Sequence, residues 1–277
     1  MLFMYEKGDK VSVYVCPVCR RPLVRDGGSY RCENRHVFDV ASSGYVNLSP
    51  PSSGTHGDDA EMVAARRAFL HTGNYDPLCA LVCEALSGKN IKTVLDAGCG
   101  EGYYTKKICE KLPGASVYGL DISKKAAEKA AKYCKDASFC VASAYRMPYA
   151  DYCFDAVVNV FSPLALDEYS RVLSPGGFLC LSVSMPDHLI ELKRAVYDDV
   201  FVKEMKEDEL PGYDLIEKKQ LRYVMELRGK QLSDLFMMTP YARKTSYKDK
   251  AKLGDVEKMN VTASFAVFIY KKIGDGH

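Results

Sequence analysis

The sequence predicts an α/β protein: a doubly wound, mostly parallel sheet of seven strands, preceded by a small zinc-ribbon-like module. Strand-like and helix-like segments alternate regularly over residues 91–184, which is typical of a parallel sheet covered by helices. A glycine-rich turn, residues 98–102, follows the first of these strands. A cysteine-rich segment, residues 16–36, precedes the whole pattern.

The composition is that of a soluble globular protein, large enough for one sizeable domain and a small module. The chain has 277 residues, 47% of them hydrophobic and 27% charged. Its net charge of +2 is too near zero to indicate a nucleic-acid partner by itself. No apolar run is long enough to span a membrane, and the first 15 residues are too polar for a signal peptide. Because the 11 cysteines indicate thiols or metal ligands, we expect a cytoplasmic protein.

The N-terminal module, expected over residues 1–48, contains four candidate zinc ligands: Cys16, Cys19, Cys32 and His36. Two cysteines separated by two residues direct both sulfurs at one ion, and the second pair completes a tetrahedron. Between the pairs, short strand segments flank an Asp-Gly-Gly sequence, residues 26–28, which indicates a hairpin. Zn²⁺ held by four protein ligands would be structural and not catalytic. The alternative is a set of unrelated thiols beside a surface histidine.

The same module is rich in arginine. It contains Arg20, Arg21, Arg25, Arg31 and Arg35, opposed by Asp26 and Glu33. This excess suits contacts with phosphates, although a solvated basic surface is equally consistent with it. Strand-like segments at residues 37–39 and 44–48 are expected to close the module, and residues 49–58 have the composition of a linker.

The larger domain is expected over residues 59–277 and begins with two helices. Asp58 or Asp59 caps the first, which ends at Gly73, and the second spans about residues 77–86. The expected strands that follow are residues 91–96, 116–121, 137–141, 154–160, 178–183, 213–227 and 262–271. Between these strands we expect one helix that follows the glycine turn and ends at about residue 112, and two more at residues 124–134 and 165–173. A further helix begins near Asp187.

The carboxyl ends of the strands form the candidate ligand site, as in other open parallel sheets. Asp121 ends the second strand, where its carboxylate can accept hydrogen bonds from two ribose hydroxyls or, alternatively, cap the next helix. Asp96 precedes the glycine turn; it is unsuited to a pyrophosphate but suits a ligand with ammonium and sulfonium groups. The turn after the third strand, with Ser143 and Ala144, is expected at the edge of an adenine.

These features, with the glycines Gly98, Gly100 and Gly102 and a Pro-Gly-Gly turn at residues 175–177, resemble the class I S-adenosylmethionine-dependent methyltransferases. The resemblance covers residues 91–184. A dinucleotide-binding oxidoreductase is the main alternative for this domain. It is disfavoured because the glycine spacing is G-x-G-x-G and not G-x-G-x-x-G.

A closer resemblance extends over nearly the whole chain. The sequence resembles the bacterial 23S ribosomal RNA guanine-N1 methyltransferases, the RlmA type that includes the tylosin-resistance enzyme. The matching segments are residues 16–19, Cys32 with His36, and residues 44–48, 59–62, 65–70, 99–105, 188–193 and 238–241. The resemblance implies S-adenosylmethionine as methyl donor, bound Zn²⁺, and methylation of N1 of a guanine in a hairpin loop of 23S ribosomal RNA. It also suggests a homodimer.

The resemblance further implies cofactor contacts at Tyr75, Gly100, Glu101, Gly102, Asp121 and His188. By sequence alone, Tyr75 would more often be a core aromatic and His188 a surface histidine. No catalytic residue is assigned. Residues 159–164 are expected to line the pocket for the target base, without Asn159 being the catalytic group.

A second basic region, residues 218–252, contains ten lysines and arginines and three acidic residues, a local excess of ten minus three, or +7. Tyr223, Phe236, Tyr241 and Tyr247 are interleaved with them. This pattern indicates an RNA-binding surface, whereas a solvated loop with core aromatics is the alternative. Two other functions stay open: a small-molecule methyltransferase with a purely structural zinc module, and a non-catalytic zinc-dependent RNA-binding protein.

Overall fold

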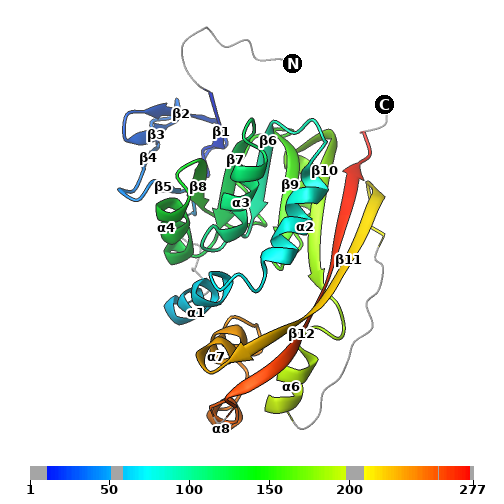
Figure 1. Cartoon of the computed structure of the whole chain (residues 1–277). Coiled ribbons are helices and arrows are strands. Elements are labelled where there is room, and N and C mark those ends of the chain that lie inside the picture. Colours follow the sequence, from blue (N-terminus) through cyan, green and yellow to red (C-terminus); the bar gives the residue numbers. More distant parts are fainter. Residues whose placement is uncertain (1–10, 51–58, 198–208, 255, 275–277) are drawn as a thin grey trace. The chain divides into compact units, whose positions relative to one another are not determined.

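The computed structural model (Figure 1) describes residues 11–50, 59–197, 209–254 and 256–274. The chain forms two compact units. The first comprises Met1–Gly57, Asn90–Leu179 and Lys272–His277, and the second comprises Asp58–Lys89 and Cys180–Lys271. Most of the predicted linker, residues 51–58, lies outside the described residues, so a domain boundary at residues 49–58 stays a prediction.

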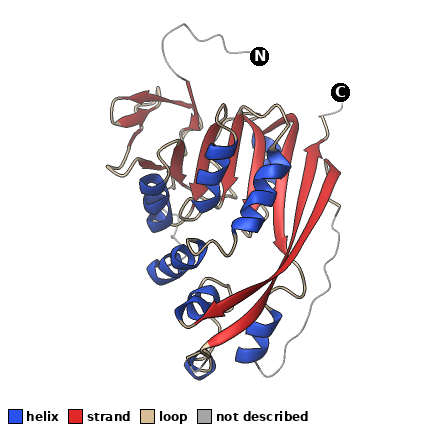
Figure 2. Ribbon diagram, in the orientation of Figure 1, coloured by secondary structure: helices blue, strands red, loops and turns tan. Residues whose placement is uncertain are grey.

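The N-terminal part of the first unit is a four-stranded antiparallel sheet without helices among its described residues (Figure 2). Its strands are β1 (Val11–Val15), β2 (Pro22–Asp26), β3 (Ser29–Arg31) and β4 (Val37–Asp39), in that order. The predicted hairpin is confirmed, because Asp26 pairs with Ser29 and Gly27 turns the chain at a φ of 57°. We call residues 11–40 the ribbon.

β4 ends the ribbon sheet as predicted, but the prediction that residues 44–48 also close it was wrong. Apart from one antiparallel bridge between Val40 and Val46, the strand β5 (Tyr45–Asn47) belongs to the main sheet. It pairs in parallel with β8 (Ala137–Val141), with Tyr45 opposite Phe139. Tyr45 and Val46 are both buried in this position, and Tyr45 joins a core cluster that includes Ala127 and Phe139. The segment therefore buries its apolar side chains as a further strand beside the seven that the sequence predicts.

The main sheet of the first unit has the strand order β10-β9-β6-β7-β8-β5. Its other strands are β6 (Thr93–Ala97), β7 (Ser116–Asp121), β9 (Phe154–Val160) and β10 (Leu173–Ser184). β7, β8 and β9 have the predicted bounds. β10 starts earlier than predicted and contains the Pro-Gly-Gly turn within it, because Gly176 allows a bend at a φ of 74°.

Among its described residues, this unit has the helices α3 (Tyr103–Lys111), α4 (Lys124–Tyr133) and α5 (Leu166–Val172). α3 and α4 lie on the same face of β6, β7 and β8 (Figure 1). α4 turns four buried alanines toward the sheet: Ala126, Ala127, Ala130 and Ala131. These small side chains let the helix approach closely, so its lysines remain on the outside.

The second unit contains α1 (Ala60–Leu70), α2 (Asp76–Leu86), α6 (Ile190–Val196), α7 (Lys230–Met237) and α8 (Tyr247–Ala251), with β11 (Tyr213–Arg228) and β12 (Lys258–Lys272). Its strand order is β11-β12-β10, so β10 contributes to both units. Asp59 caps α1 as predicted, by accepting a hydrogen bond from the Met62 amide. α6 begins later than predicted, because Leu189 is in the left-handed region (φ 56°). Among the described residues, no helix is both long and apolar enough to cross a membrane.

The ribbon is joined to the main sheet of the first unit by backbone hydrogen bonds. The Val15 amide donates to the Pro148 carbonyl over 2.9 Å, and the Ala150 amide donates to the Val13 carbonyl over 2.9 Å. Between them, the buried ring of Tyr14 stacks on Tyr149, with centroids 5.3 Å apart. β1 is therefore paired on both of its edges, with β2 on one side and with residues 148–150 on the other.

Two arginines fix the same segment. Arg20 of the ribbon donates to the carbonyls of Met147 (2.9 Å) and Tyr149 (3.3 Å), and Arg171 of α5 donates to the same two carbonyls over 3.0 and 2.8 Å. Glu168 accepts from both the Nε and an Nη of Arg171 and from the Met147 amide. Hydrogen bonds to charged groups are stronger than neutral ones, so this network anchors the ribbon.

We predict that Arg171→Met lowers the free energy of unfolding by roughly 2–3 kcal/mol, because it removes the charged donor of the half-buried Glu168 and one of the two arginines that bind the Met147 and Tyr149 carbonyls. Arg31→Met, which removes an exposed ion pair with Asp26, should cost less than about 1 kcal/mol. Urea unfolding of both variants measures the difference. Equal losses would contradict an anchoring role of Arg171.

Candidate functional site

The four predicted zinc ligands lie together. Their ligand atoms are all within 4.8 Å of one another. The sulfurs of Cys19 and Cys32 are 3.7 Å apart, and Nδ1 of His36 is 3.4 Å from the sulfurs of both Cys16 and Cys32. Tetrahedral Zn²⁺ with bonds of about 2.3 Å to sulfur and about 2.0 Å to nitrogen gives ligand separations of about 3.5–3.8 Å. The donor set and its spacing fit a structural zinc ion.

The ribbon arginines are mostly used within the protein. Arg21 pairs with Glu33, Arg31 pairs with Asp26, and Arg20 anchors the ribbon. Arg25 has no carboxylate partner among the described residues; its guanidinium lies 5.7 Å from the centre of the Tyr30 ring. Arg21 and Arg31 remain more than half exposed in their ion pairs, so the phosphate-binding role of these arginines stays a prediction.

The glycine turn between β6 and α3 depends on backbone conformations that side chains disfavour. Gly98, Gly100 and Gly102 have φ angles of 85°, 56° and 87°. A Cβ at Gly98 would lie 2.4 Å from the Cβ of Ser162, whereas a Cβ at Gly100 would meet nothing within 4 Å. The turn is thus packed at its start and open at Gly100, where a ligand can approach the backbone.

Asp121 at the end of β7 is tied to this turn. One of its carboxylate oxygens accepts from the Gly100 amide over 2.9 Å, and the other accepts from the Ser123 amide over 2.8 Å. Ser123, and not Asp121, caps α4 by accepting from the Ala126 amide. Because the capping alternative is filled by Ser123, the half-buried Asp121 carboxylate is positioned beside the open part of the turn.

Asp96 lies at the end of β6 and is 2% exposed. Burial raises the pKa of its carboxyl group to about 7; the Thr105 hydroxyl, which donates to it over 2.6 Å, opposes this rise and the Asp121 charge adds to it. Sequence reasoning missed Thr105. The signal available was a hydroxyl in the first turn of α3, the turn that faces the end of β6.

The other cofactor candidates of the first unit lie at the same strand ends. The Ala142 amide donates to the Asp121 carbonyl over 3.1 Å, which joins the ends of β7 and β8. The half-buried residues Ser143 and Ala144 follow directly, and the Ser143 hydroxyl accepts from the Tyr145 amide. Glu101, in the glycine turn, is buried at 1% exposure.

Tyr75 and His188 meet inside the second unit, with the Tyr75 hydroxyl 3.3 Å from Nε2 of His188. The Ser264 amide donates to Nδ1, so Nδ1 is an acceptor and the neutral ring carries its proton on Nε2. Nε2 then donates to the Tyr75 oxygen, which leaves the Tyr75 proton available for another acceptor. Burial, with Lys193 nearby, lowers the pKa of His188 to about 3, so the ring is neutral at physiological pH.

Asn159 has a structural role in the loop after β9. It is buried; its Nδ2 donates to the Pro163 carbonyl and the Tyr169 hydroxyl, and its Oδ1 accepts from the Ser162 amide. These bonds fix a loop in which Phe161 has a φ of 57° and is 45% exposed. Backbone strain of this kind in a nonglycine residue concentrates at functional sites.

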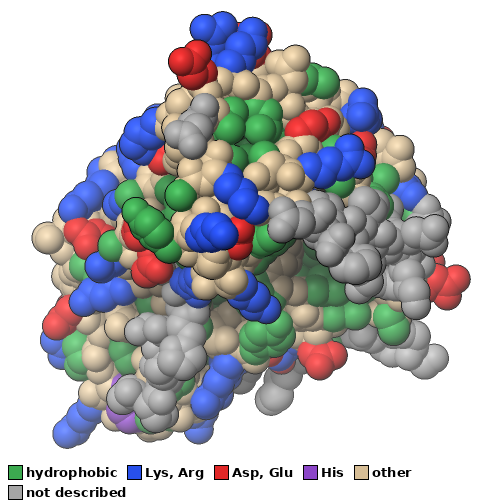
Figure 3. Space-filling model, turned by 90° about the horizontal axis from the view of Figure 1, so that it is seen from below, with side chains coloured by type: hydrophobic (Ala, Val, Ile, Leu, Met, Phe, Trp, Pro, Cys, Tyr) green, Lys and Arg blue, Asp and Glu red, His purple; other side chains and the backbone are tan. Residues whose placement is uncertain are grey.

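Five of the ten cations in the basic region at residues 218–252 form the following ion pairs with carboxylates. Ion pairs join Lys219 to Glu84 and Glu217, Arg222 to Asp187, Arg228 to Glu226, Lys230 to Asp234, and Lys252 to Asp249. Figure 3 shows basic side chains interspersed with acidic and uncharged ones on the face it displays. Phe236 is buried and the Tyr223 hydroxyl donates to the Asn74 carbonyl, so only Tyr247, 89% exposed, fits a stacking surface well.

Two family models match the chain. One described as "Methyltransferase domain" matches residues 94–177, and one described as "RlmA, N-terminal" matches residues 14–53. The first match includes the glycine turn and Asp121, and the second includes all four candidate zinc ligands. The chain is thus a methyltransferase with a zinc ribbon, and the methyl donor of its fold is S-adenosylmethionine.

Relatives match most of the chain. The 23S rRNA (guanine(748)-N(1))-methyltransferase of Streptomyces fradiae is 34% identical over 81% of this chain and 84% of its own. YxjB of Bacillus subtilis, provisionally named as a 23S rRNA (guanine-N1)-methyltransferase, is 31% identical over 94% of this chain and 98% of its own. Since both exceed 30% identity over most of either chain, this protein belongs to the family of 23S rRNA (guanine-N1)-methyltransferases.

Proposed function

We propose that the protein transfers a methyl group from S-adenosylmethionine to N1 of a guanine in a hairpin loop of 23S ribosomal RNA, in the cytoplasm. One observation carries this proposal: the Cys₃His ribbon is hydrogen-bonded into the same unit that contains the glycine turn, Asp96 and Asp121. This junction holds the ribbon at a fixed position in the unit that contains the cofactor edge. The homodimer that the family resemblance suggests stays a prediction.

We assign the cofactor contacts as follows. The Asp121 carboxylate would accept the ribose hydroxyls, and the open backbone at Gly100, beside Gly98, Glu101 and Gly102, would border the cofactor. Asp96 would face its cationic end, and Ser143 with Ala144 would border the adenine. In the second unit, Tyr75 would donate its remaining proton to the cofactor, and His188 would hold the Tyr75 hydroxyl in that orientation.

The bound cofactor supplies an already activated sulfonium methyl group, so positioning contributes most of the acceleration. The chain has to hold a guanine out of its stack with N1 toward that methyl group. The loop fixed by Asn159 suits this role, because it presents the exposed side chains of Phe161 and Leu164, 45% and 40% exposed, to an unstacked base. The N1 proton must leave as the bond forms, and a donor near O6 would stabilise the charge that develops there.

Methyl transfer to unmethylated 23S ribosomal RNA tests the proposal. With labelled cofactor, the protein should methylate N1 of a guanine in one hairpin loop, as mapped by primer extension. Asp121→Ala should lose at least about tenfold in cofactor affinity, because a charged hydrogen-bond acceptor is removed, and Asp136→Ala, an exposed carboxylate of the same unit, is the matched control. Methylation of a small molecule only, or of a different RNA atom, would overturn the proposal.

The affinity for the cofactor should depend on pH through Asp96. A cationic ligand favours the ionised carboxylate, whose pKa is raised to about 7 by burial. The affinity should therefore rise roughly tenfold between pH 5.5 and 7. Asp96→Asn should bind more weakly and show a flat profile; His188 does not interfere, since its pKa is lowered to about 3. Calorimetry measures the cofactor affinity of the wild-type chain and of the variant at each pH. A wild-type affinity that does not change with pH would contradict a contact between Asp96 and the cationic end of the cofactor.

A further inference from the structure

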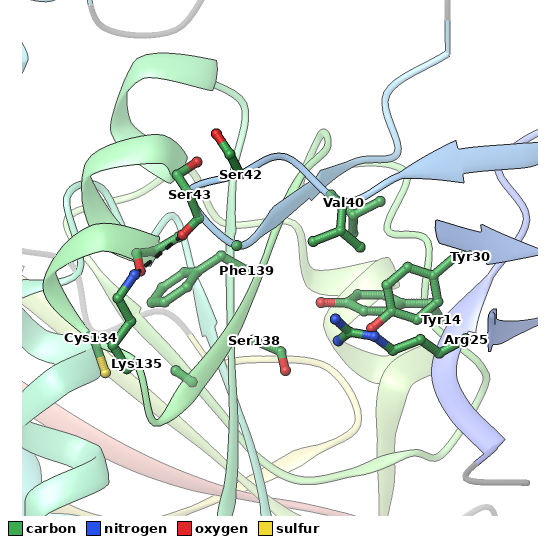
Figure 4. Close-up of a pocket in the computed structure, with 14 residues that line it drawn as sticks. Tyr14, Arg25, Tyr30, Val40, Ser42, Ser43, Cys134, Lys135, Ser138 and Phe139 are labelled. Carbon is green, nitrogen blue, oxygen red and sulfur yellow. Dashed lines mark hydrogen bonds between the residues drawn. The ribbon is translucent and has the colours of Figure 1, made fainter. Parts of the chain in front are cut away.

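We propose that a cavity between the ribbon and the amino end of β8 binds one unstacked nucleotide of the substrate RNA. The inference rests on the proposed function and adds a second contact site to it. The cavity has a volume of about 340 Å³, within the range of small-ligand sites. Figure 4 shows Tyr14, Tyr30 and Arg25 of the ribbon on one side, with Ser42, Ser43 and Lys135 on the other.

The cavity is separate from the cofactor edge. β5 begins opposite Phe139, so the first two residues of β8, Ala137 and Ser138, have no partner strand on that side. These two residues line the cavity at the amino end of β8. Asp121 and Ser143 lie at the carboxyl ends of their strands, the opposite edge of the sheet. The cavity is therefore not part of the cofactor site.

The lining has the chemistry of a nucleotide site. Tyr30 and Tyr14 meet edge to face, with ring centroids 5.3 Å apart, and the edges of these largely buried rings form an apolar part of the lining. Ser42, Ser43 and Ser138 supply hydroxyls that can bond to ribose or to the edge of a base. Aromatic and hydroxyl groups together suit the two parts of a nucleoside.

The charge at the cavity is positive. Neither Arg25 nor Lys135 has a carboxylate partner among the described residues; Lys135 donates only to the backbone carbonyls of Ala131 and Ser43. No acidic side chain lines the cavity. Asp26 and Asp136 adjoin these two cations in the chain, but neither lines the cavity, and Asp26 pairs with Arg31. A guanidinium and an ammonium that are not ion-paired favour an anionic ligand, and both are common partners of phosphate.

The neighbouring helix favours RNA over a free anion. α4 and the turn after it contain five lysines against two acidic residues, Glu128, which pairs with Lys132, and the exposed Asp136; the lysines are Lys124, Lys125, Lys129, Lys132 and Lys135. α4 is capped by Ser123, two residues after Asp121, and Ala131 of its last turn lines the cavity. Its ten residues span about 15 Å. A row of cations of this length can bind successive phosphates between the cofactor edge and the cavity.

Paired substitutions test the charges. Arg25→Gln with Lys135→Gln should weaken binding of the 23S hairpin roughly tenfold and reduce the salt slope of binding by about two. Affinity for S-adenosylmethionine should be unchanged. Arg31→Gln with Lys111→Gln removes the same charge from exposed positions of the ribbon and α3, and should change RNA affinity less than about twofold. Equal losses in both pairs, or none in either, would overturn the site.

A third variant separates entry of a nucleotide from attraction by charge. Ser138→Leu fills the cavity without changing a charge, and should also weaken hairpin binding about tenfold if a base enters. Unchanged RNA affinity with retained zinc and normal thermal unfolding would overturn the nucleotide site. If the wild-type chain methylates the hairpin while every variant matches it, this inference alone fails. If the wild-type chain binds cofactor but does not methylate the hairpin, the proposed function fails and takes this inference with it.

Discussion

The structure depends on a shared set of backbone groups at residues 147–150. β1 of the ribbon pairs with this segment, and Arg20 and Arg171, from distant parts of the chain, donate to the same two carbonyls. The stacked Tyr14 and Tyr149 exclude water from these bonds, which strengthens them. A module of this size cannot stabilise itself by a core alone, so its metal and this junction together determine its position. The ribbon, the cavity and the cofactor edge are consequently parts of one unit.

Local patterns predicted much of this unit. The bounds of β7, β8 and β9 follow from apolar runs ended by turn residues, and the zinc cluster follows from ligand spacing. The features that could not be predicted from the sequence depend on contacts between residues far apart in the chain. The partner of β5 is 94 residues away in the pairing of Tyr45 with Phe139, and no local pattern distinguishes the end of a ribbon from the edge of another sheet. Likewise, the basic excess of residues 218–252 was counted without partners such as Asp187 and Glu84, which lie outside that window.

The candidate site residues also divide into those that a local pattern identifies and those that only the packing identifies. Asp96 and Asp121 could be identified because each ends a strand before a turn, whereas the hydrogen bond from Thr105 to Asp96 is seen only in the structure. The packing also distinguishes roles that sequence left open: Ser123 caps α4, which leaves Asp121 to the glycine turn. Asn159 is saturated by internal hydrogen bonds, so its contribution is the shape of the loop that follows it. The lysines of α4 form a basic row between the cofactor edge and the ribbon. Counting charges separately in the N-terminal module and in residues 218–252 did not reveal this row.

Hydrogen exchange before and after zinc removal tests most directly whether the ribbon and the cofactor sheet form one structural unit. Chelation removes the folding free energy that the metal supplies to the ribbon. If the junction couples the two parts, the amides of Val15 and Ala150, and those of β8 beyond them, should lose protection together with residues 16–36. Amides of β12 that lie in the second unit should keep theirs. Retained protection at Ala150 and β8 while residues 16–36 exchange freely would contradict the account.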